Sequence, residues 1–241
     1  MTTTILTTMT TPTAIPMTEV ATILRLQSWF SPAFPIGAFS YSHGLETAIE
    51  AGAVHDRATL AAWVEHLLTA GSGRTDGAFF AAAWRAMPDV GAVAALADEA
   101  AAWIPTAELM TEARHQGDAF LSTARAAWPD ARLDALAAAL SARPVISVAA
   151  GAVAAAHGAP LDLALPLFLQ AFAANVISAG VRLVPLGQTD GQRAIAGLEP
   201  VVAEAARIAA ATTPDALWTA TPAHEIYSMR HETQYTRIFR S

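Results

Sequence analysis

The chain has 241 residues, of which 54% are hydrophobic and 15% charged, and its formal net charge is −7. This size and composition suit one large domain with a substantial core, and they exclude an intrinsically disordered chain. The negative charge argues against nucleic acid as a partner, and the absence of cysteine excludes disulfides and thiolate chemistry and fits a cytoplasmic protein.

The N-terminal segment, residues 1–18, is rich in threonine and lacks the basic and continuous apolar regions of a signal peptide. We predict a disordered tail there. Residues 19–30 form the first predicted helix, which Pro32 and Pro35 end because proline cannot continue a helix.

Two capped helices are predicted after these prolines. Ser40 or Ser42 can cap a helix that runs to Ala51. Asp56 caps the next helix, whose apolar residues recur at helical spacing and form one stripe: Leu60, Trp63, Val64, Leu67 and Leu68.

The glycine-rich stretch 71–77 lacks the GK[ST] sequence of a phosphate-binding loop, and we interpret it as a connection between two helices. Asp76 then starts a helix, and Thr106 caps a long one that reaches Trp128. The buried face of this long helix is predicted to carry Leu109, Met110, Ala113, Phe120, Leu121, Ala124 and Trp128.

The later helices are predicted to be separated by five prolines: Pro129, Pro144, Pro160, Pro185 and Pro200. Residues 163–181 carry no charge, but polar residues and a proline interrupt them, which favours a buried central helix over a membrane span. No series of alternating strands is recognisable. We therefore predict an all-α fold, a single-domain bundle of roughly ten helices over residues 19–225.

One group of residues could bind a metal. His43, Glu46 and Glu50 are spaced so that they share one face of a helix, which allows an all-α metal-dependent enzyme as an alternative function. A solvated polar face explains the same spacing. Neither HE pair continues to the HExxH spacing, and no nucleophile elbow is present, so no catalytic residue, metal ligand or cofactor-binding residue is predicted.

The C-terminal tail, residues 226–241, differs from the acidic body. Its end combines three arginines and two aromatic residues with a single glutamate: Arg230, Arg237, Arg240, Tyr235, Phe239 and Glu232. Arginine and aromatic residues are enriched in the cores of protein interfaces. We interpret the segment as a partner-binding tail, with a tail folded back on its own domain as the alternative.

Three segments together resemble the UreF family of urease accessory proteins: SPAFPIGAFSYSHGLE (31–46), NVISAGVRLVPLGQTDGQR (175–193) and MRHETQYTRIFRS (229–241). They occur in the family's order, and the likeness extends over about residues 20–241. The resemblance implies an all-α, non-catalytic protein that dimerises, binds UreD (also called UreH) and recruits the GTPase UreG. Nickel and GTP are then handled by the partner proteins, and nickel is delivered to the urease apoprotein.

The resemblance also implies contact residues. In that family the C-terminal tail orders on binding UreD, and the surface near the tyrosine-containing loop serves the GTPase. The residues of this sequence that match these motifs are Phe39, Tyr41, His43, Glu46, Arg230, His231, Glu232, Tyr235, Arg237, Phe239 and Arg240.

Overall fold

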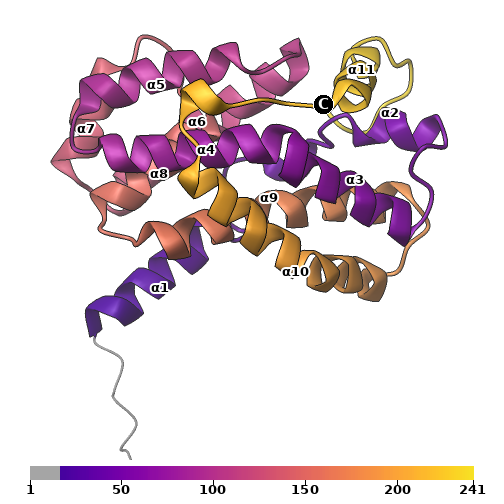
Figure 1. Ribbon diagram of the computed structural model, residues 1–241, viewed down its shortest axis with the longest axis horizontal. Helices are drawn as coiled ribbons and strands as arrows, with labels where there is room; N and C mark the ends of the chain where they lie inside the picture. Colours follow the sequence, from indigo (N-terminus) through magenta and orange to yellow (C-terminus); the bar gives the residue numbers. More distant parts are fainter. Residues whose placement is uncertain (1–16) are drawn as a thin grey trace, which may run out of the picture.

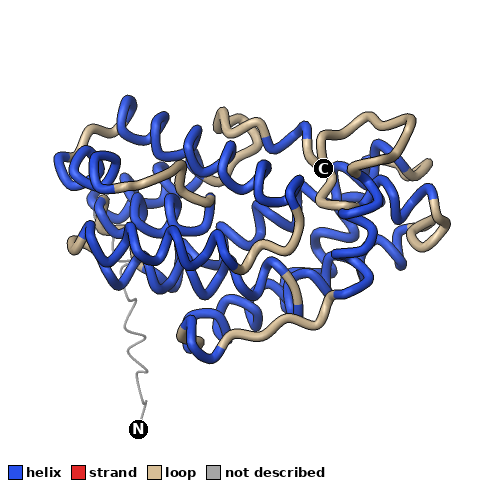
Figure 2. The backbone as a smooth tube through the Cα atoms, turned by 90° about the horizontal axis from the view of Figure 1, so that it is seen from above, coloured by secondary structure: helices blue, strands red, loops and turns tan. Residues whose placement is uncertain are grey.

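A computed structural model describes residues 17–241, and within this range the chain forms eleven α-helices, two short 3-10 helices and no strand (Figure 1; Figure 2). The elements are α1 (Met17–Trp29), η1 (Ala38–Ser40), α2 (Leu45–Glu50), α3 (Arg57–Ala70), α4 (Ser72–Ala86), α5 (Val90–Ala102), α6 (Ala107–Ala127), α7 (Ala131–Ala139), α8 (Ile146–Ala156), α9 (Leu161–Leu183), α10 (Gln188–Ala211), η2 (Pro214–Ala216) and α11 (Pro222–His231). The all-α prediction is confirmed. The predicted N-terminal tail lies outside the described residues, except that Met17 and Thr18 already belong to α1.

Helix α4 is the centre of the bundle and packs against α3, α5, α8, α9 and α10. Figure 1 shows α5 and α7 on one side of α4, and α9 and α10 on the other. The most extensive helix–helix contact is between α4 and α8, where a Cβ at Gly151 would collide with the backbone carbonyl of Phe80. Glycine at this position lets the two helices pack backbone against backbone.

The predicted caps of α3 and α6 and the predicted apolar stripe of α3 are confirmed. Asp56 accepts the Thr59 N–H in a capping box at the start of α3, and every residue of the predicted α3 stripe is buried. Thr106 caps α6 through the Leu109 N–H. On α6 the predicted residues Met110, Ala113 and Trp128 are only partly buried.

Two predicted helix breaks are wrong. Stretch 71–77 is no connection, because only Gly71 separates α3 from α4, and Gly73 and Asp76 lie inside α4. A Cβ at Gly73 would lie 2.8 Å from the Leu68 Cα, so this glycine permits close packing rather than ending a helix. Pro200 lies inside α10, which continues to Ala211.

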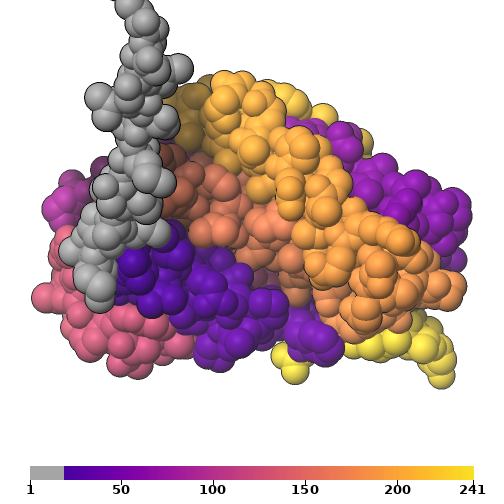
Figure 3. Space-filling view, turned by 90° about the horizontal axis from the view of Figure 1, so that it is seen from below, coloured from indigo at the N-terminus to yellow at the C-terminus, as the bar shows by residue number. Residues whose placement is uncertain are grey.

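Helix α9 is, among the described residues, the one helix long and apolar enough to cross a membrane by length and composition. Half of its most apolar window is buried inside the fold, where α9 packs against α3, α4 and α10. This position agrees with the predicted buried helix. Figure 3 shows α10 in orange across one face of the molecule, with parts of the C-terminal tail in yellow projecting at its margin.

Candidate functional site

The proline-rich loop, residues 30–44, joins α1 to α2 and ends in two consecutive residues with left-handed backbone conformation. These are His43, with φ 58°, and Gly44, with φ 76°. The second position suits glycine, which adopts positive φ without strain. The two residues delay the start of α2, so Gly44 is the N-cap in place of the predicted serines, although Ser42 Oγ still accepts a hydrogen bond from Glu46 N at 3.3 Å.

His43, Glu46 and Glu50 do not share a helix face, because His43 precedes α2. His43 Nε2 lies 2.8 Å from Ser72 Oγ on α4, Glu46 faces the C-terminal tail, and Glu50 is exposed. In the part of the chain that the structure describes, no three His, Asp or Glu side chains are grouped to hold a metal ion. The shared helix face on which the alternative of a metal-dependent enzyme depended is therefore absent, because His43 lies before α2.

The C-terminal tail folds back along the proline-rich loop. Its first six residues complete α11, and the remainder runs beside the loop in an irregular conformation. Ser42 N donates to the Ser241 carbonyl oxygen at 2.9 Å, and Arg240 N donates to the Ser40 carbonyl oxygen at 2.9 Å. Ser42 Oγ donates to the same Ser241 oxygen. The loop and the tail therefore form one structural unit.

Glu46 on α2 is the main acceptor for the tail. Its carboxylate accepts the backbone N–H groups of Ile238 at 2.7 Å and Phe239 at 3.0 Å. The same carboxylate lies 3.2 Å from His231 Nε2. Since Glu46 is only 6% exposed, these contacts satisfy a carboxylate that would otherwise be buried at a high cost.

His231 joins the tail to α6. The ring is fully buried, and its Nδ1 lies 2.7 Å from Glu108 Oε2. Arg237 donates to the other oxygen of Glu108 at 2.7 Å. A chain of polar side-chain contacts therefore runs from Arg237 through Glu108 and His231 to Glu46, and it connects α2, α6, α11 and the tail.

Glu108 and Glu112 on α6 are functional candidates that the sequence interpretation did not include. Glu112 accepts hydrogen bonds from Ser241 Oγ at 2.6 Å and Gln116 Nε2 at 3.0 Å. Its Oε2 lies 3.5 Å from His43 Nδ1. The spacing of Glu108, Glu112 and Gln116 places them on one helix face. This pattern is visible in the sequence and could have identified them as candidates.

Tyr41 lies inside the fold rather than on its surface. It is 4% exposed, and its hydroxyl lies 3.1 Å from His115 Nδ1 on α6. The side chain therefore fixes the proline-rich loop to α6 from within. Its predicted role in partner binding stays a prediction, and the exposed residue next to it is Phe39, at 68%.

Arg182, near the end of α9, connects the three motif segments. Its guanidinium carbon lies 3.7 Å from the ring centroid of Phe39 and 4.4 Å from that of Phe239. Arg182 Nη1 also donates to the Phe39 carbonyl oxygen at 2.9 Å. A guanidinium over an aromatic face is attracted by the ring quadrupole. The sequence interpretation gave Arg182 no role, and the only signal was its place in the second motif.

The predicted contact residues divide into two groups. The buried or partly buried group fixes the loop and the tail to the body: Tyr41, His43, Glu46, His231 and Phe239. The exposed group also includes two residues with contacts to the body, Arg237 to Glu108 and Phe39 to Arg182. Its members are Phe39, Arg230, Glu232, Tyr235, Arg237 and Arg240. The exposed group combines arginine with aromatic side chains, as interface cores do.

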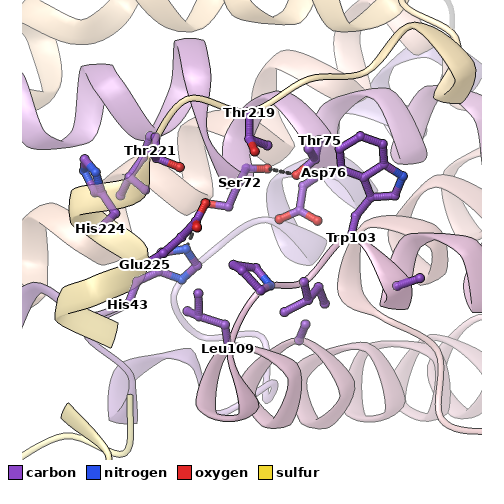
Figure 4. A pocket seen from close by; sticks show the side chains of 15 residues that line it. His43, Ser72, Thr75, Asp76, Trp103, Leu109, Thr219, Thr221, His224 and Glu225 are labelled. Atoms are coloured by element: carbon purple, nitrogen blue, oxygen red, sulfur yellow. Dashed lines mark hydrogen bonds between the residues drawn. The ribbon is translucent and has the colours of Figure 1, made fainter. Parts of the chain in front are cut away.

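Two partly open cavities of about 310 and 340 Å³ both have Asp76 in their lining. The first is lined by side chains from α4, α6 and α11, from His43, and from the segments at residues 103–105 and 219–221 (Figure 4). Burial raises the pKa of Asp76 to about 6, and the Glu112 carboxylate adds to the rise. Burial lowers the pKa of His224 to about 4. Near pH 7 the first cavity therefore combines a carboxylate with a neutral imidazole.

These features define an all-α protein in which the proline-rich loop, the C-terminal tail and α9 build one composite surface. The sequence matches the family model of UreF over residues 54–199. It is 48% identical to the urease accessory protein UreF of Bradyrhizobium diazoefficiens over 225 residues, covering 92% of this chain and 93% of the relative. It is 47% identical to the protein of that name from Rhodopseudomonas palustris over 232 residues, covering 95% and 98%.

A third relative, the urease accessory protein UreF of Granulibacter bethesdensis, is 48% identical over 223 residues, covering 92% of this chain and 94% of the relative. The chain belongs to the UreF family of urease accessory proteins. It is therefore an accessory protein and not an enzyme.

Proposed function

We propose that the chain is a non-catalytic scaffold for nickel insertion into the urease apoprotein. In this proposal it forms a homodimer in the cytoplasm and binds UreD (UreH) and the GTPase UreG. It binds no cofactor of its own, because UreG hydrolyses GTP and the partner proteins handle the nickel. The observation that supports this function best is the meeting of the three motif segments at Arg182.

The exposed face of the tail has the chemistry of a protein-binding surface. Tyr235 and Ile238 are 103% and 77% exposed, and Met229 on α11 is 50% exposed. Arg230, Arg237 and Arg240 lie among them and are exposed as well. We propose that this face binds UreD, while the inward side chains keep the tail on the body. The net charge of −7 argues against nucleic acid, and the packing of α9 argues against membrane insertion.

The UreD assignment is tested with the double variant Tyr235→Ala/Ile238→Ala and co-purification with UreD. Both side chains are exposed, so we expect an intact fold and loss of at least nine-tenths of the captured UreD. The matched control is Ile23→Ala/Leu24→Ala, which removes two exposed apolar side chains from α1. Capture at the wild-type level by the tail variant would reject the tail as the UreD site.

The GTPase assignment is tested by light scattering of the complex with UreD and UreG, with and without a GTP analogue. The mass of the wild-type complex also reports whether two copies of this chain are present. Phe39→Ala should remove UreG from the complex and leave UreD bound, because Phe39 is exposed on the loop rather than on the tail. A mass that includes UreG in the variant would assign the GTPase to another surface.

A further inference from the structure

We propose that Arg74 and Trp218 form a binding site for an acidic side chain, aspartate or glutamate, of the partner UreD. Arg74 lies in the first turn of α4, and Trp218 lies in the α10–α11 connection, residues 212–221, so neither belongs to the proline-rich loop or the C-terminal tail. The stacking of the two side chains is a property of the free chain. Its assignment to UreD rests on the proposed function, and the two parts are tested separately below.

The α10–α11 connection is held on the body at both ends. Arg85 on α4 donates to the Ala210 carbonyl oxygen in the last turn of α10 at 2.6 Å. At the other end, Ala220 N donates to the Ala70 carbonyl oxygen of α3 at 2.8 Å, and the Ala220 carbonyl oxygen lies 3.1 Å from His66 Nε2. Figure 1 shows the end of α10 and this connection passing across α4. The connection is therefore a fixed part of the fold.

Arg74 carries a charge that the described part of the chain leaves without a counter-charge. Its guanidinium carbon lies 4.2 Å from the ring centroid of Trp218, and its side chain forms no ion pair or hydrogen bond with a described residue. The Nε atom is enclosed without an acceptor, whereas Nη1 and Nη2 are open to solvent. Stacking uses the face of the guanidinium and leaves these in-plane N–H groups free to bind a ligand.

Other arginines of the chain show what is missing at Arg74. Arg125 pairs with Asp134 at 2.8 Å, and Arg207 pairs with Glu204 at 2.6 Å. These cations are exposed and are neutralised by carboxylates of the chain itself. Arg74 is half-buried, and a partly buried cation is expected to be paired because its hydration is incomplete.

The chemistry of the site fits a carboxylate. Trp218 is 49% exposed, and its indole N–H makes no hydrogen bond to a described residue. Guanidinium and indole offer donors and no acceptor, whereas an ionised carboxylate only accepts. Nη1 and Nη2 of Arg74 can hold its two oxygens in a fork, which is the strong form of this contact.

The combination of side chains indicates a protein rather than a free anion. Arginine and tryptophan are the residue types most enriched among interface hot spots, and a small anion would use the guanidinium alone. The net charge of −7 also disfavours the capture of small anions from solution. The connection leads directly into α11, whose exposed Met229 belongs to the face that we propose for UreD. We therefore assign the acid to UreD.

The first experiment observes the stack in the free chain by ¹⁹F NMR after labelling with 5-fluorotryptophan. The chain has six tryptophans, and Trp218→Phe identifies the signal of Trp218. Arg74→Gln should shift this signal and leave the others in place. The matched control, Arg207→Gln, removes an exposed arginine from α10 and should shift none. An unchanged Trp218 signal in Arg74→Gln would overturn the stack, and so would a shift of all signals, since it would report a change of the whole fold.

The second experiment measures the affinity of the full chain for UreD. Arg74→Gln and Trp218→Ala should each weaken binding at least tenfold, as the loss of a hot-spot side chain does. Arg74→Lys should weaken it at least threefold, because lysine keeps the charge without the fork and the stack. Arg207→Gln should stay within twofold of wild type. An equal loss in Arg207→Gln and Arg74→Gln would reduce the effect to overall charge and overturn the site.

The outcomes separate this site from the proposed function. If Arg74→Gln bound UreD within twofold of wild type while Tyr235→Ala/Ile238→Ala lost it, the site would be overturned and the scaffold function would stand. If the wild-type chain did not bind UreD, the proposed function would fail and the UreD assignment with it. The ¹⁹F signals would still decide whether the stack exists.

The third experiment tests the chemistry of the ligand by exchange of charges. Arg74→Glu should abolish binding of wild-type UreD, and one Asp→Arg or Glu→Arg substitution on the surface of UreD should restore it. Failure of every such substitution to restore binding would overturn the ion pair. Millimolar inorganic phosphate, added to the labelled free chain, should leave the Trp218 signal in place. A saturable shift with phosphate would reassign the site to a free anion and overturn the protein ligand.

Discussion

A single buried carboxylate, that of Glu46, receives two backbone N–H groups and one imidazole from the C-terminal tail. Glu46→Gln replaces one acceptor oxygen by an NH2 donor that faces other donors. We expect the free energy of unfolding to fall by about 1–3 kcal/mol, the usual range for a buried group left unsatisfied. Urea denaturation at pH 7 measures the loss. Exposed Glu50→Gln is the control and should stay within about 0.5 kcal/mol of wild type, and an equal effect of both variants would contradict the role of Glu46.

Asp76 predicts a pH dependence of stability. Its pKa is raised by burial from 3.8 to about 6, so between these values the folded state binds the proton more tightly than the unfolded state does. Stability contributed by this group is therefore present at low pH and is lost as the pH rises through about 6. Asp76→Asn should flatten this slope and raise stability at pH 7.5 by about 1–3 kcal/mol. Urea midpoints from pH 4 to pH 8 measure it, and parallel curves for variant and wild type would contradict it.

At the residue scale, local chemistry was predictable and distant partners were not. Asp56 and Thr106 bond to amides three residues away, so their capping roles follow from short sequence patterns. Glu46 and Ser42 bond to groups near the other end of the chain, and no local pattern specifies such contacts. The same limitation explains why Tyr41 was expected on the surface, although its hydroxyl faces His115.

At the scale of elements, the glycines decide how closely helices approach. Gly151 on α8 has no space for a Cβ against the Phe80 carbonyl of α4, whereas a Cβ at Gly197 on α10 would meet nothing within 4 Å. Gly151→Ala should therefore destabilise the fold by about 1–3 kcal/mol through overpacking. Gly197→Ala should stabilise it by about 0.5–1 kcal/mol through reduced entropy of the unfolded chain. Thermal unfolding measures both changes in stability. Unfolding temperatures that move in the same direction in the two variants would refute the packing argument.

The existence and order of the helices followed from periodicity and caps, and the errors fell where packing overrides local preference. Gly73 resembles a helix end in sequence, yet in α4 it makes room for the adjoining Leu68 backbone. Pro200 resembles a helix break in sequence, but α10 continues past it. The apolar side of α10 packs on α3, α4 and α9. Tertiary contacts offset the local cost of these residues, and a single sequence does not display such contacts.

At the scale of the whole molecule, the C-terminal tail packs on the body, as in the alternative of a tail folded back on its own domain. Its role in partner binding stays a prediction. Removal of residues 235–241 would uncover Glu46 and delete Phe239, which is 3% exposed. We expect this truncation to lower the free energy of unfolding by about 2–4 kcal/mol, comparable with loss of a large core side chain. Tyr235→Ala, at a fully exposed position, is the control for chemical denaturation and should have almost no effect. Equal stability of the truncated and full-length chains would show that the tail contributes nothing to the fold.

The pairing of Ser42 with Ser241 spans 199 positions of the chain, and it has a consequence for biosynthesis. A ribosome makes the proline-rich loop early and the segment that completes it roughly 10–40 s later, at about 5–20 residues per second. During that interval Glu46, Glu108 and Glu112 lack the partners that the tail supplies. The contacts between loop and tail therefore form only after residues 236–241 have left the exit tunnel. If this composite binds partners as we propose, a nascent chain cannot recruit them through it.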